Sequence, residues 1–114
     1  MSGEPLYIPD RCDIVWISFD PQKGHEQNGH RPGFVLSPRR YNNLTGLAFV
    51  CPITSRVRGY PFEIKLPDTA PVKGVILVDQ MRAVDWRDRK PRYAGRSEAV
   101  LEEVVERLIS IIEG

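Results

Sequence analysis

The sequence predicts a mainly β protein with one C-terminal α-helix, in which the strands form a small curled sheet or β-barrel. Short apolar segments rich in β-branched and aromatic residues follow one another at close spacing. Loops rich in proline and glycine separate them, and the chain holds 10 prolines and 9 glycines. The segment after Ser97 instead repeats its apolar residues at helical spacing. A chain of 114 residues is expected to form one domain, residues 1–114.

Each strand is predicted from its own pattern. Residues 12–19 combine β-branched and aromatic side chains. Residues 60–66 alternate apolar and charged side chains, as in a half-exposed strand, whereas residues 75–78 are continuously apolar, as in a buried one. The stretch 39–46 is turn-rich and has room for a short helical turn. The predicted strands are residues 12–19, 33–36, 47–52, 60–66 and 75–78.

The C-terminal helix is predicted to begin at Ser97, whose hydroxyl is a suitable N-cap, with Glu98 in the first turn. Its apolar residues fall on one face and its glutamates on the other, as in a helix that packs on a sheet. The apolar face consists of Val100, Leu101, Val104, Val105, Leu108, Ile111 and Ile112. The preceding basic run, residues 87–96, is interpreted as a solvated loop that could also line a nucleic-acid path.

The net charge of +1 hides an asymmetry along the chain. From Ser97 onward five glutamates face Arg107 alone, which gives −4. Residues 1–96 hold 15 basic and 10 acidic side chains, which gives +5. A positive body favours a polyanionic partner, either nucleic acid or an acidic peptide.

Hydropathy and cysteine content limit the class of protein. No apolar run reaches membrane-spanning length and the N-terminus has no signal sequence, so we expect a cytoplasmic protein with no membrane partner. Cys12 and Cys51 lie far apart in apolar segments, where buried reduced thiols are expected rather than a disulfide. Trp16 and Trp86 could stack on bases, but the strand alternation around Trp16 predicts a core residue.

Three polar clusters lie at the ends of predicted strands. In the first, Pro32 restricts the backbone of Arg31 where a polar loop meets an apolar strand. Strand ends of a small barrel can converge on one surface, and we therefore treat the clusters together. Their members are His25, Glu26, Gln27, His30 and Arg31; Thr54, Ser55, Arg56 and Arg58; and Asp79, Gln80 and Arg82.

The residue types in these clusters indicate an anionic ligand. Guanidinium groups present a planar fork of donors that suits phosphate. There is no His-x-His pair, no cysteine pair and no carboxylate cluster, so neither a metal nor a cofactor is predicted. A glycosidase needs two opposed carboxylates, and by residue type Glu26 and Asp79 could be that pair. The arginines of the clusters favour an anionic ligand instead.

Cleavage of RNA needs no metal when the ribose 2′-OH is the nucleophile. It needs a base near that hydroxyl, cations around the phosphorane and a donor for the leaving oxygen. Glu26 or a histidine is a candidate base, Arg31 a candidate for the developing charge, and Thr54 a candidate hydrogen-bond donor. Structural roles remain open as well: turn capping for Thr54, closure of a strand end for Asp79, and a solvated loop for the histidines.

Six short motifs occur in a characteristic order between Gly24 and Gln80. They are Gly24-x-Glu26-Gln27-x-Gly29-His30-Arg31-Pro32, Leu36-Ser37-Pro38, Tyr41-Asn42, Pro52-Ile53-Thr54-Ser55, Gly59-Tyr60-Pro61-Phe62 and Asp79-Gln80. Each alone is weak, but the series resembles the MazF/PemK toxins of bacterial toxin–antitoxin pairs, and MazF more than Kid/PemK.

The resemblance implies an SH3-like, PemK-like barrel with a C-terminal helix, assembled as a homodimer. It also implies a sequence-specific, metal-independent endoribonuclease that cleaves single-stranded mRNA, leaves a 2′,3′-cyclic phosphate and a 5′-hydroxyl, and so inhibits translation and growth. In such pairs a MazE-like antitoxin neutralises the toxin by laying an acidic, extended C-terminal segment over the RNA groove. The positive body of this chain fits that partner.

The family's catalytic arginine and threonine correspond to Arg31 and Thr54, and its loop glutamate corresponds to Glu26. We assign the other members of the three clusters to substrate binding. They are His25, Gln27, His30, Ser55, Arg56, Arg58, Asp79, Gln80 and Arg82.

The chain departs from the family pattern at a few positions. His25 stands where close relatives have serine, Ile53 where cysteine is usual, and Arg82 where lysine is usual. Leu77 replaces an arginine that acts catalytically in the Kid-type branch, so the arginine–aspartate–histidine scheme of that branch is not supported here, and a catalytic role for Asp79 is in doubt.

Two other functions fit the predicted fold. A gyrase-inhibiting toxin on the same type of barrel would cut nothing and would depend on its C-terminal end, which here ends in plain helix. A non-catalytic SH3-like binding module would show an aromatic groove rather than a set of Arg, Thr and Glu.

Overall fold

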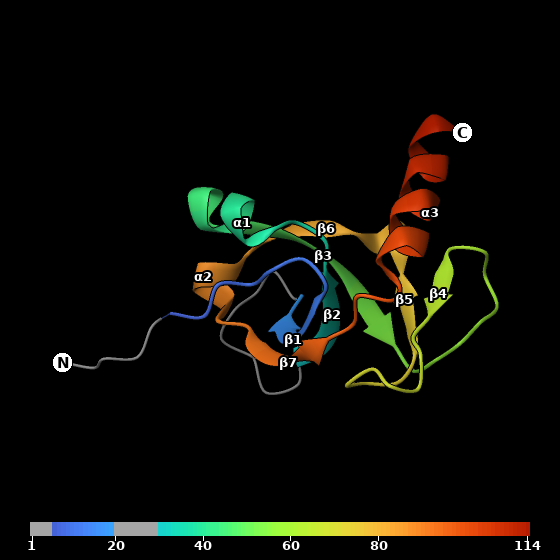
Figure 1. Cartoon of the computed structure of the whole chain (residues 1–114), viewed down its shortest axis with the longest axis horizontal. Helices are drawn as coiled ribbons and strands as arrows, with labels where there is room; N and C mark the ends of the chain where they lie inside the picture. Colours follow the sequence, from blue (N-terminus) through green and yellow to red (C-terminus); the bar gives the residue numbers. More distant parts are fainter. Residues whose placement is uncertain (1–5, 20–29) are drawn as a thin grey trace.

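The structure, a computed structural model, describes residues 6–19 and 30–114, and these form a mainly antiparallel sheet followed by a helix (Figure 1). The strands are β1 (Asp13–Ser18), β2 (His30–Val35), β3 (Leu47–Thr54), β4 (Glu63–Lys65), β5 (Val75–Leu77), β6 (Arg82–Asp85) and β7 (Arg92–Arg96). The helices are α1 (Arg39–Thr45), α2 (Trp86–Arg89), α3 (Leu101–Glu113) and a 3₁₀ turn, η2 (Val78–Gln80). The predicted fold class, mainly β with a C-terminal helix, is confirmed.

β3 is the centre of the sheet, because it pairs with β2 along one edge and with β6 and then β5 along the other. Val50 lies opposite Arg82 of β6, and Ile53 lies opposite Ile76 of β5. Pro52 stands between these two positions, so a residue without a backbone N–H occupies the point where the partner strand changes. The end of β3 is thereby surrounded by β2 and β5.

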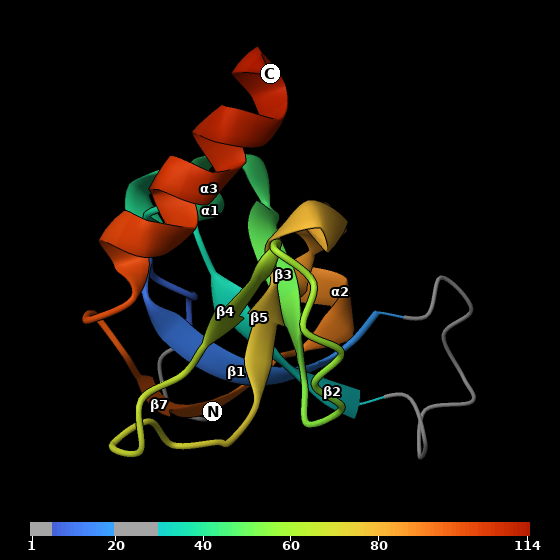
Figure 2. The ribbon, with the colours of Figure 1, turned by 90° about the vertical axis from the view of Figure 1, so that its right-hand side faces the viewer.

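The sheet is curled rather than closed over the described residues. Its strand order is β4-β5-β3-β2-β1-β7, and β6 pairs with β3 off this path. β4 and β7 lie at the two ends of the order, and no pairing joins them within residues 6–19 and 30–114. Figure 2 shows β4 and β5 in front of β1, and Figure 1 shows β3 between β2 and β5.

The sheet separates two clusters of buried apolar residues. Successive residues of β1 contribute to different clusters, Ile14 to one and Val15 to the other, as the period of two in a strand requires. The first cluster includes Val104 of α3, so the helix covers it. The second includes Trp86 of α2. Cys12 and Cys51 are buried free thiols, as predicted.

The C-terminal helix begins later than predicted. α3 starts at Leu101, and its N-cap Val100 makes no side-chain cap hydrogen bond. Ser97 is buried instead, and its N–H donates to the carbonyl of Cys12 at 3.0 Å. The prediction of Ser97 as the N-cap is therefore wrong, because a hydrogen bond to a distant segment holds its backbone outside the helix.

The basic run 87–96 is not a solvated loop. It holds the end of α2 and the whole of β7, and Arg87 Nη2 donates to the carbonyl of Asn43 at 2.8 Å. Pro91 and Gly95 look like turn signals in the sequence. In the structure Pro91 precedes β7, and Gly95 lies beside an irregularity in the pairing with β1, where both residue types are tolerated.

The two tryptophans differ in burial. Trp86 is fully buried, and its Nε1 donates to the carbonyl of Asn42 at 2.9 Å. Trp16 is only partly buried, so the core position predicted for it is wrong. It lies opposite Pro32 and Arg92, beyond the last β1 residue of the cluster under α3.

Other segments follow the prediction more closely. The turn-rich stretch at 39–46 contains α1. The expected strand at 60–66 is reduced to β4, although Ile64 and Leu66 are buried and Lys65 is exposed as the alternation predicts. Within residues 6–19 and 30–114, no helix combines the length and apolar character needed to cross a membrane.

Candidate active site

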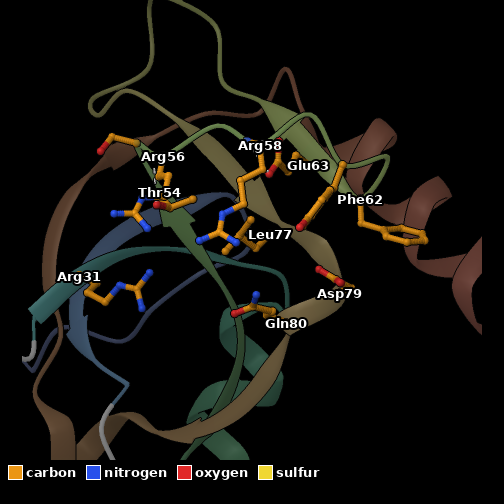
Figure 3. Close-up of a pocket in the computed structure, with 11 residues that line it drawn as sticks. Arg31, Thr54, Arg56, Arg58, Phe62, Glu63, Leu77, Asp79 and Gln80 are labelled. Atoms are coloured by element: carbon orange, nitrogen blue, oxygen red, sulfur yellow. Dashed lines mark hydrogen bonds between the residues drawn. The ribbon is translucent and has the colours of Figure 1, made fainter.

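A cavity of about 570 Å³ opens at the end of β3, between β2, β5 and the loop of residues 55–62 (Figure 3). We call it the cleft. Its lining includes at least one member of each of the three polar clusters. The lining residues are Arg31, Thr54, Ser55, Arg56, Arg58, Tyr60, Phe62, Glu63, Leu77, Asp79 and Gln80.

Arg31 enters the cleft from β2, and Figure 3 shows its guanidinium pointing into the cavity. Pro32 fixes the backbone torsion directly after it. A Cβ on Gly33 would lie 2.6 Å from Val50 and 3.0 Å from Phe19, so only glycine allows this approach of the neighbouring segments. The base of the Arg31 side chain is therefore held by a rigid, closely packed strand.

Thr54 is the last residue of β3 and is only partly buried. Its Oγ1 accepts the N–H of Arg56 at 3.1 Å, which is the turn-capping role that its sequence context allowed. The hydroxyl proton remains available to a ligand. A Cβ on Gly74, whose φ is +131°, would come within 2.8 Å of the carbonyl carbon of Thr54, so a glycine there lets β5 approach the Thr54 backbone.

Three guanidinium groups face the cleft without a described carboxylate partner. Arg31, Arg56 and Arg58 are exposed, and the ion pairs among the described residues involve other arginines. Like charges gathered in this way attract a polyanion and are stabilised when it binds. The cleft is therefore suited to phosphate groups.

Asp79 and Gln80 come from η2, directly after β5. The turn is tied to the loop by the N–H of Val78, which donates to the carbonyl of Phe62 at 3.1 Å. The side chains of Asp79 and Gln80 are exposed and make no hydrogen bond among the described residues, so a backbone group closes this strand end. Burial, together with the Asp79 carboxylate, raises the pKa of the Cys51 thiol to about 12 and keeps it neutral.

Not every predicted site residue lines the cleft. His30 is exposed in β2 but is not part of the lining. The Nη1 of Arg82 donates to the carbonyl of Phe19 at 2.9 Å, and its guanidinium lies 5.5 Å from the centre of the Phe19 ring. The candidates His25, Glu26 and Gln27 lie outside the described residues.

Four lining residues were missing from the predicted site. Three of them lie in or next to the Gly59-to-Phe62 motif, shortly after the basic residues Arg56 and Arg58; they are Tyr60, Phe62 and Glu63. That motif could have identified them as site residues. The fourth, Leu77, is apolar, and nothing in the sequence marked it as part of a site. No group of three His, Cys, Asp or Glu side chains that could hold a metal ion occurs in the described part of the chain.

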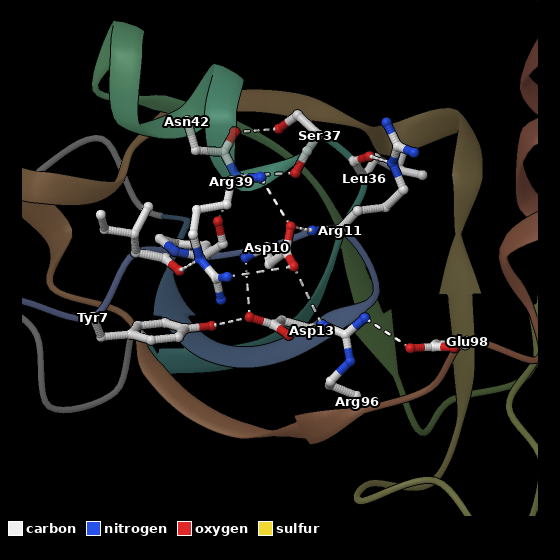
Figure 4. Close-up of polar contacts among 12 residues, drawn as sticks. Tyr7, Asp10, Arg11, Asp13, Leu36, Ser37, Arg39, Asn42, Arg96 and Glu98 are labelled. Atoms are coloured by element: carbon white, nitrogen blue, oxygen red, sulfur yellow. Dashed lines mark hydrogen bonds and ion pairs between the residues drawn. The ribbon is translucent and has the colours of Figure 1, made fainter.

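A second charged cluster shares no residue with the cleft (Figure 4). We call it the polar anchor, and its centre is Asp13, which is 1% exposed. Asp13 accepts hydrogen bonds from the Tyr7 hydroxyl at 2.6 Å, the N–H of Asp10 at 3.0 Å and Arg96 Nη1 at 2.7 Å. Arg96 Nη2 also donates to Glu98 at 2.9 Å. The anchor joins the N-terminal segment to β7.

These contacts shift the proton affinity of the groups involved. Burial, and then the hydrogen bond to Asp13, raises the pKa of Tyr7 well above its usual range. The hydrogen bonds to Glu98 and Asp13 raise the pKa of Arg96, although partial burial opposes them. Partial burial also opposes the N–H groups of Arg39 and Arg11, which nevertheless lower the pKa of Asp10. Each charged group of the anchor therefore has a hydrogen-bond or ion-pair partner within the protein.

Comparisons with known proteins show which family the chain belongs to. Residues 10–112 match the family model described as PemK-like, MazF-like toxin of type II toxin–antitoxin system. The chain is 49% identical over 83 residues to the endoribonuclease toxin MazF of Escherichia coli K12, covering 73% of this chain and 74% of that protein. It is 34% identical over 108 residues to an Escherichia coli endoribonuclease PemK, covering 90% and 81%.

Solved structures with a similar fold belong to proteins of the same name. The crystal structure of MazF from Deinococcus radiodurans superposes with a TM-score of 0.84 at 49% identity, covering 95% of this chain and 99% of that one. A MazE–MazF crystal structure from the same organism gives a TM-score of 0.82 at 44% identity, covering 93% and 96%.

Proposed function

The chain belongs to the PemK-like, MazF-like toxin family of type II toxin–antitoxin systems and is an endoribonuclease toxin, and we propose that it cleaves single-stranded mRNA at a short preferred sequence without a metal ion. The 2′-OH of the ribose before the cleaved bond is the nucleophile. The products carry a 2′,3′-cyclic phosphate and a 5′-hydroxyl. Cleavage of mRNA in the cytoplasm then stops translation and growth.

The observation that carries this proposal is that Thr54 and three guanidinium groups, none with a carboxylate partner among the described residues, line one cavity. Arg31, Arg56 and Arg58 supply the positive charge that a phosphorane needs, and they do so on elements fixed by the sheet and its loop. The Thr54 hydroxyl is oriented by the N–H of Arg56 and adds a donor beside them. Anionic strands are attracted here rather than neutral sugars.

The reaction divides its tasks among these groups. A base removes the proton of the 2′-OH while its oxygen forms a bond to phosphorus. Arg31 stabilises the negative charge on the non-bridging oxygens of the phosphorane, and Thr54 donates a hydrogen bond to one of them. The bond to the 5′-oxygen then breaks, and that oxygen takes up a proton. Glu26 remains the candidate base, with His25 beside it.

The remaining cluster members contact the bound RNA. The rest of the predicted set that lines the cleft can contact the nucleotides on either side of the cleaved bond as well: Ser55, Arg56, Arg58, Asp79 and Gln80. Their mixture of cations, amide and carboxylate can distinguish base edges as well as bind phosphates.

The test is cleavage of a long single-stranded RNA in excess EDTA, with both ends of each product mapped. We expect cuts at one short recurrent sequence, 5′-hydroxyl and cyclic phosphate ends, and no loss of rate in EDTA. Loss of cutting in EDTA would contradict metal independence, and 5′-phosphate ends would contradict attack by the 2′-OH. A folded protein that cuts no RNA would favour a gyrase-inhibiting toxin or a binding module.

A cognate MazE-like antitoxin is the proposed protein partner. The support is the MazE–MazF complex of Deinococcus radiodurans, whose MazF is 44% identical to this chain, and the cleft cations, which have no carboxylate partner among the described residues and suit an acidic extended peptide. We expect a synthetic peptide from the acidic C-terminus of the antitoxin to inhibit cleavage in competition with RNA. Inhibition that excess RNA does not relieve would contradict a shared site.

A homodimer is proposed from the apolar surface of α3. Val105, Ile109 and Ile112 are 39%, 46% and 78% exposed, and a groove of about 460 Å³ lined mainly by apolar side chains lies beside them. A stable dimer buries about 800 Å² on each partner, and we place the centre of that surface on the exposed face of α3 and its groove. Light scattering is expected to give the mass of a dimer, and Ile109→Glu the mass of a monomer, with Leu44→Glu on α1 as the control.

A further inference from the structure

The loop of residues 55–62 has little packing to hold it in place. It borders the cleft and also a second cavity of about 680 Å³, and both cavities include Ser55, Tyr60 and Glu63 in their lining. Val57 is 63% exposed and Tyr60 is 58% exposed. A segment with open space around it needs hydrogen bonds to keep one conformation.

The carboxylate of Glu63 supplies those bonds. The N–H of Arg58 donates to Oε1 at 3.3 Å and to Oε2 at 3.1 Å, and the N–H of Gly59 donates to Oε1 at 2.9 Å. Elsewhere in the loop Arg56 donates to Thr54, the Tyr60 carbonyl accepts from the N–H of Glu63 at 3.2 Å, and Phe62 accepts from Val78. At Arg58 and Gly59, the described hydrogen bonds to the sheet thus all come from one side chain at the start of β4.

The backbone conformation at this point depends on the same contact. Gly59 has a φ of +81°, in the left-handed region, and no atom lies within 4 Å of the position where its Cβ would be. The turn is therefore not imposed by neighbouring side chains. Two successive N–H groups instead converge on one carboxylate, and the Arg58 side chain leaves the turn toward the cleft (Figure 3).

We infer that Glu63 is a positioning residue, which holds the backbone of Arg58 so that its guanidinium meets the RNA in one fixed place. A cation held in advance loses less conformational freedom on binding than one on a free loop, so the contact increases affinity for RNA. It also narrows the range of sequences that fit, because the loop wall keeps one shape. This inference rests on the proposed ribonuclease function.

A purely electrostatic role of Glu63 would have the opposite effect. Its negative charge stands near three arginines, and removing it would strengthen binding of a polyanion. Two substitutions separate these roles. Glu63→Ala removes both the charge and the acceptors. Glu63→Gln removes the charge but can keep an oxygen at the position of Oε1, which accepts from both Arg58 and Gly59.

The experiment measures KM and kcat on an RNA of defined sequence, and the set of sequences cut in a long RNA. We expect Glu63→Ala to raise KM by about ten- to a hundredfold and to cut additional sequences, because a displaced cation no longer meets its phosphate or base. We expect Glu63→Gln to keep the sequence preference of the unsubstituted protein and to have a KM no higher than its KM, because the loop stays in place and only the negative charge is lost. Asp68→Ala is the matched control, since it removes an exposed carboxylate without a described contact to the loop.

A double substitution adds a sharper criterion. If Glu63 acts through Arg58, Glu63→Ala has little further effect on KM in an Arg58→Ala protein. The inference is overturned if Glu63→Ala and Glu63→Gln change KM alike, or if Glu63→Ala lowers only the melting temperature. If Glu63→Ala does not fold, amide exchange decides: in the unsubstituted protein Arg58 and Gly59 must exchange more slowly than Val57. An unsubstituted protein that cuts no RNA counts against the proposed function instead.

Discussion

Arginine has two different environments in this protein, one in the polar anchor and one in the cleft. In the anchor, Arg96 lies 2.7 Å from the buried carboxylate of Asp13 and also binds Glu98. In the cleft, Arg31, Arg56 and Arg58 have no carboxylate partner among the described residues. The same side chain joins segments of the fold in one place and remains available to a ligand in the other.

The difference shows what each site contributes. A buried carboxylate is costly to desolvate, and Asp13 is stable only because donors from two segments surround it. The exposed cations of the cleft repel one another weakly, because water and salt screen them. That repulsion is relieved when a polyanion binds. Changes in the anchor should therefore affect stability, and changes in the cleft should affect cleavage.

Arg31→Ala is expected to have the largest effect, and only on catalysis. Removing one charge-stabilising group lowers kcat by about 10² to 10³. The melting temperature should stay within error, since Arg31 is exposed and has no described partner. Single-turnover cleavage and thermal unfolding of the same preparation check both statements.

The matched control for Arg31 is Arg40→Ala, which removes an exposed arginine on α1 outside the cleft. It should cut RNA at the rate of the unsubstituted protein. An Arg31→Ala protein with full activity would remove Arg31 from the mechanism, and an equal loss in both variants would reduce its role to general attraction.

Asp13→Ala is expected to act in the opposite way. Asp13 is buried and accepts three hydrogen bonds, and hydrogen bonds to a charged group contribute about 1.5–3 kcal/mol, so its removal should destabilise the fold by about 3 kcal/mol even though Arg96 keeps Glu98 as a partner. The Tyr7 hydroxyl and one N–H group lose their acceptor as well. Denaturant unfolding measures the loss. The kcat of the fraction that remains folded should be unchanged, and a large drop in kcat would mean that the anchor also shapes the cleft.

Thr54→Ala is expected to have an intermediate effect. A hydrogen bond to a charged group contributes about 1.5–3 kcal/mol. Loss of that bond in the transition state lowers kcat by about ten- to a hundredfold with little change in KM. Thr54→Ser keeps the hydroxyl and should restore the rate. Equal losses in kcat/KM and in binding would make Thr54 a binding residue.

Tyr7→Phe is expected to have the smallest effect, and one that depends on pH. Because the pKa of Tyr7 is raised in the folded state, the unfolded chain releases this proton first as the pH rises above its ordinary value of 10.0. The stability contributed by Tyr7 is therefore complete below pH 10 and declines above it. Near neutral pH the substitution should cost about 1.5 kcal/mol, the lower end of the range for a hydrogen bond to a charged group, since Asp13 keeps its other donors.

Unfolding measured at a series of pH values tests the prediction for Tyr7. Between pH 10 and 11 the unfolding free energy of the unsubstituted protein should fall more steeply than that of Tyr7→Phe. Equal slopes would mean that Tyr7 ionises alike in both states. Substitution of Tyr93 with Phe gives the comparison, since Tyr93 is half exposed and packs against Tyr7 at 5.7 Å.

Much of the fold was predictable because its strands carry local signals. β1, β3 and β5 are apolar runs, and the alternation around Ile64 located β4. β6 and β7 were not found, since they are short and rich in charged residues. Their strand conformation comes from pairing with β3 and β1, which no local pattern records.

The site was predictable to a similar degree. Residue type and position at strand ends identified Arg31, Thr54 and Arg58, all of which line the cleft. The same reasoning included Arg82, whose guanidinium instead contacts Phe19. It overlooked Glu63, because a glutamate in an alternating strand looks like any solvent-facing residue.

The sequence by itself determined the mainly β fold, the C-terminal helix, the two buried thiols and the types of residue available for chemistry. Periodicity and composition are properties of neighbouring residues, so they can be read from the chain. Tertiary structure alone decided which arginines have carboxylate partners among the described residues, why Ser97 does not begin the helix, and which carboxylate holds the cleft loop. Those outcomes depend on contacts such as Arg96 with Asp13, 83 residues apart, whose formation is decided by packing.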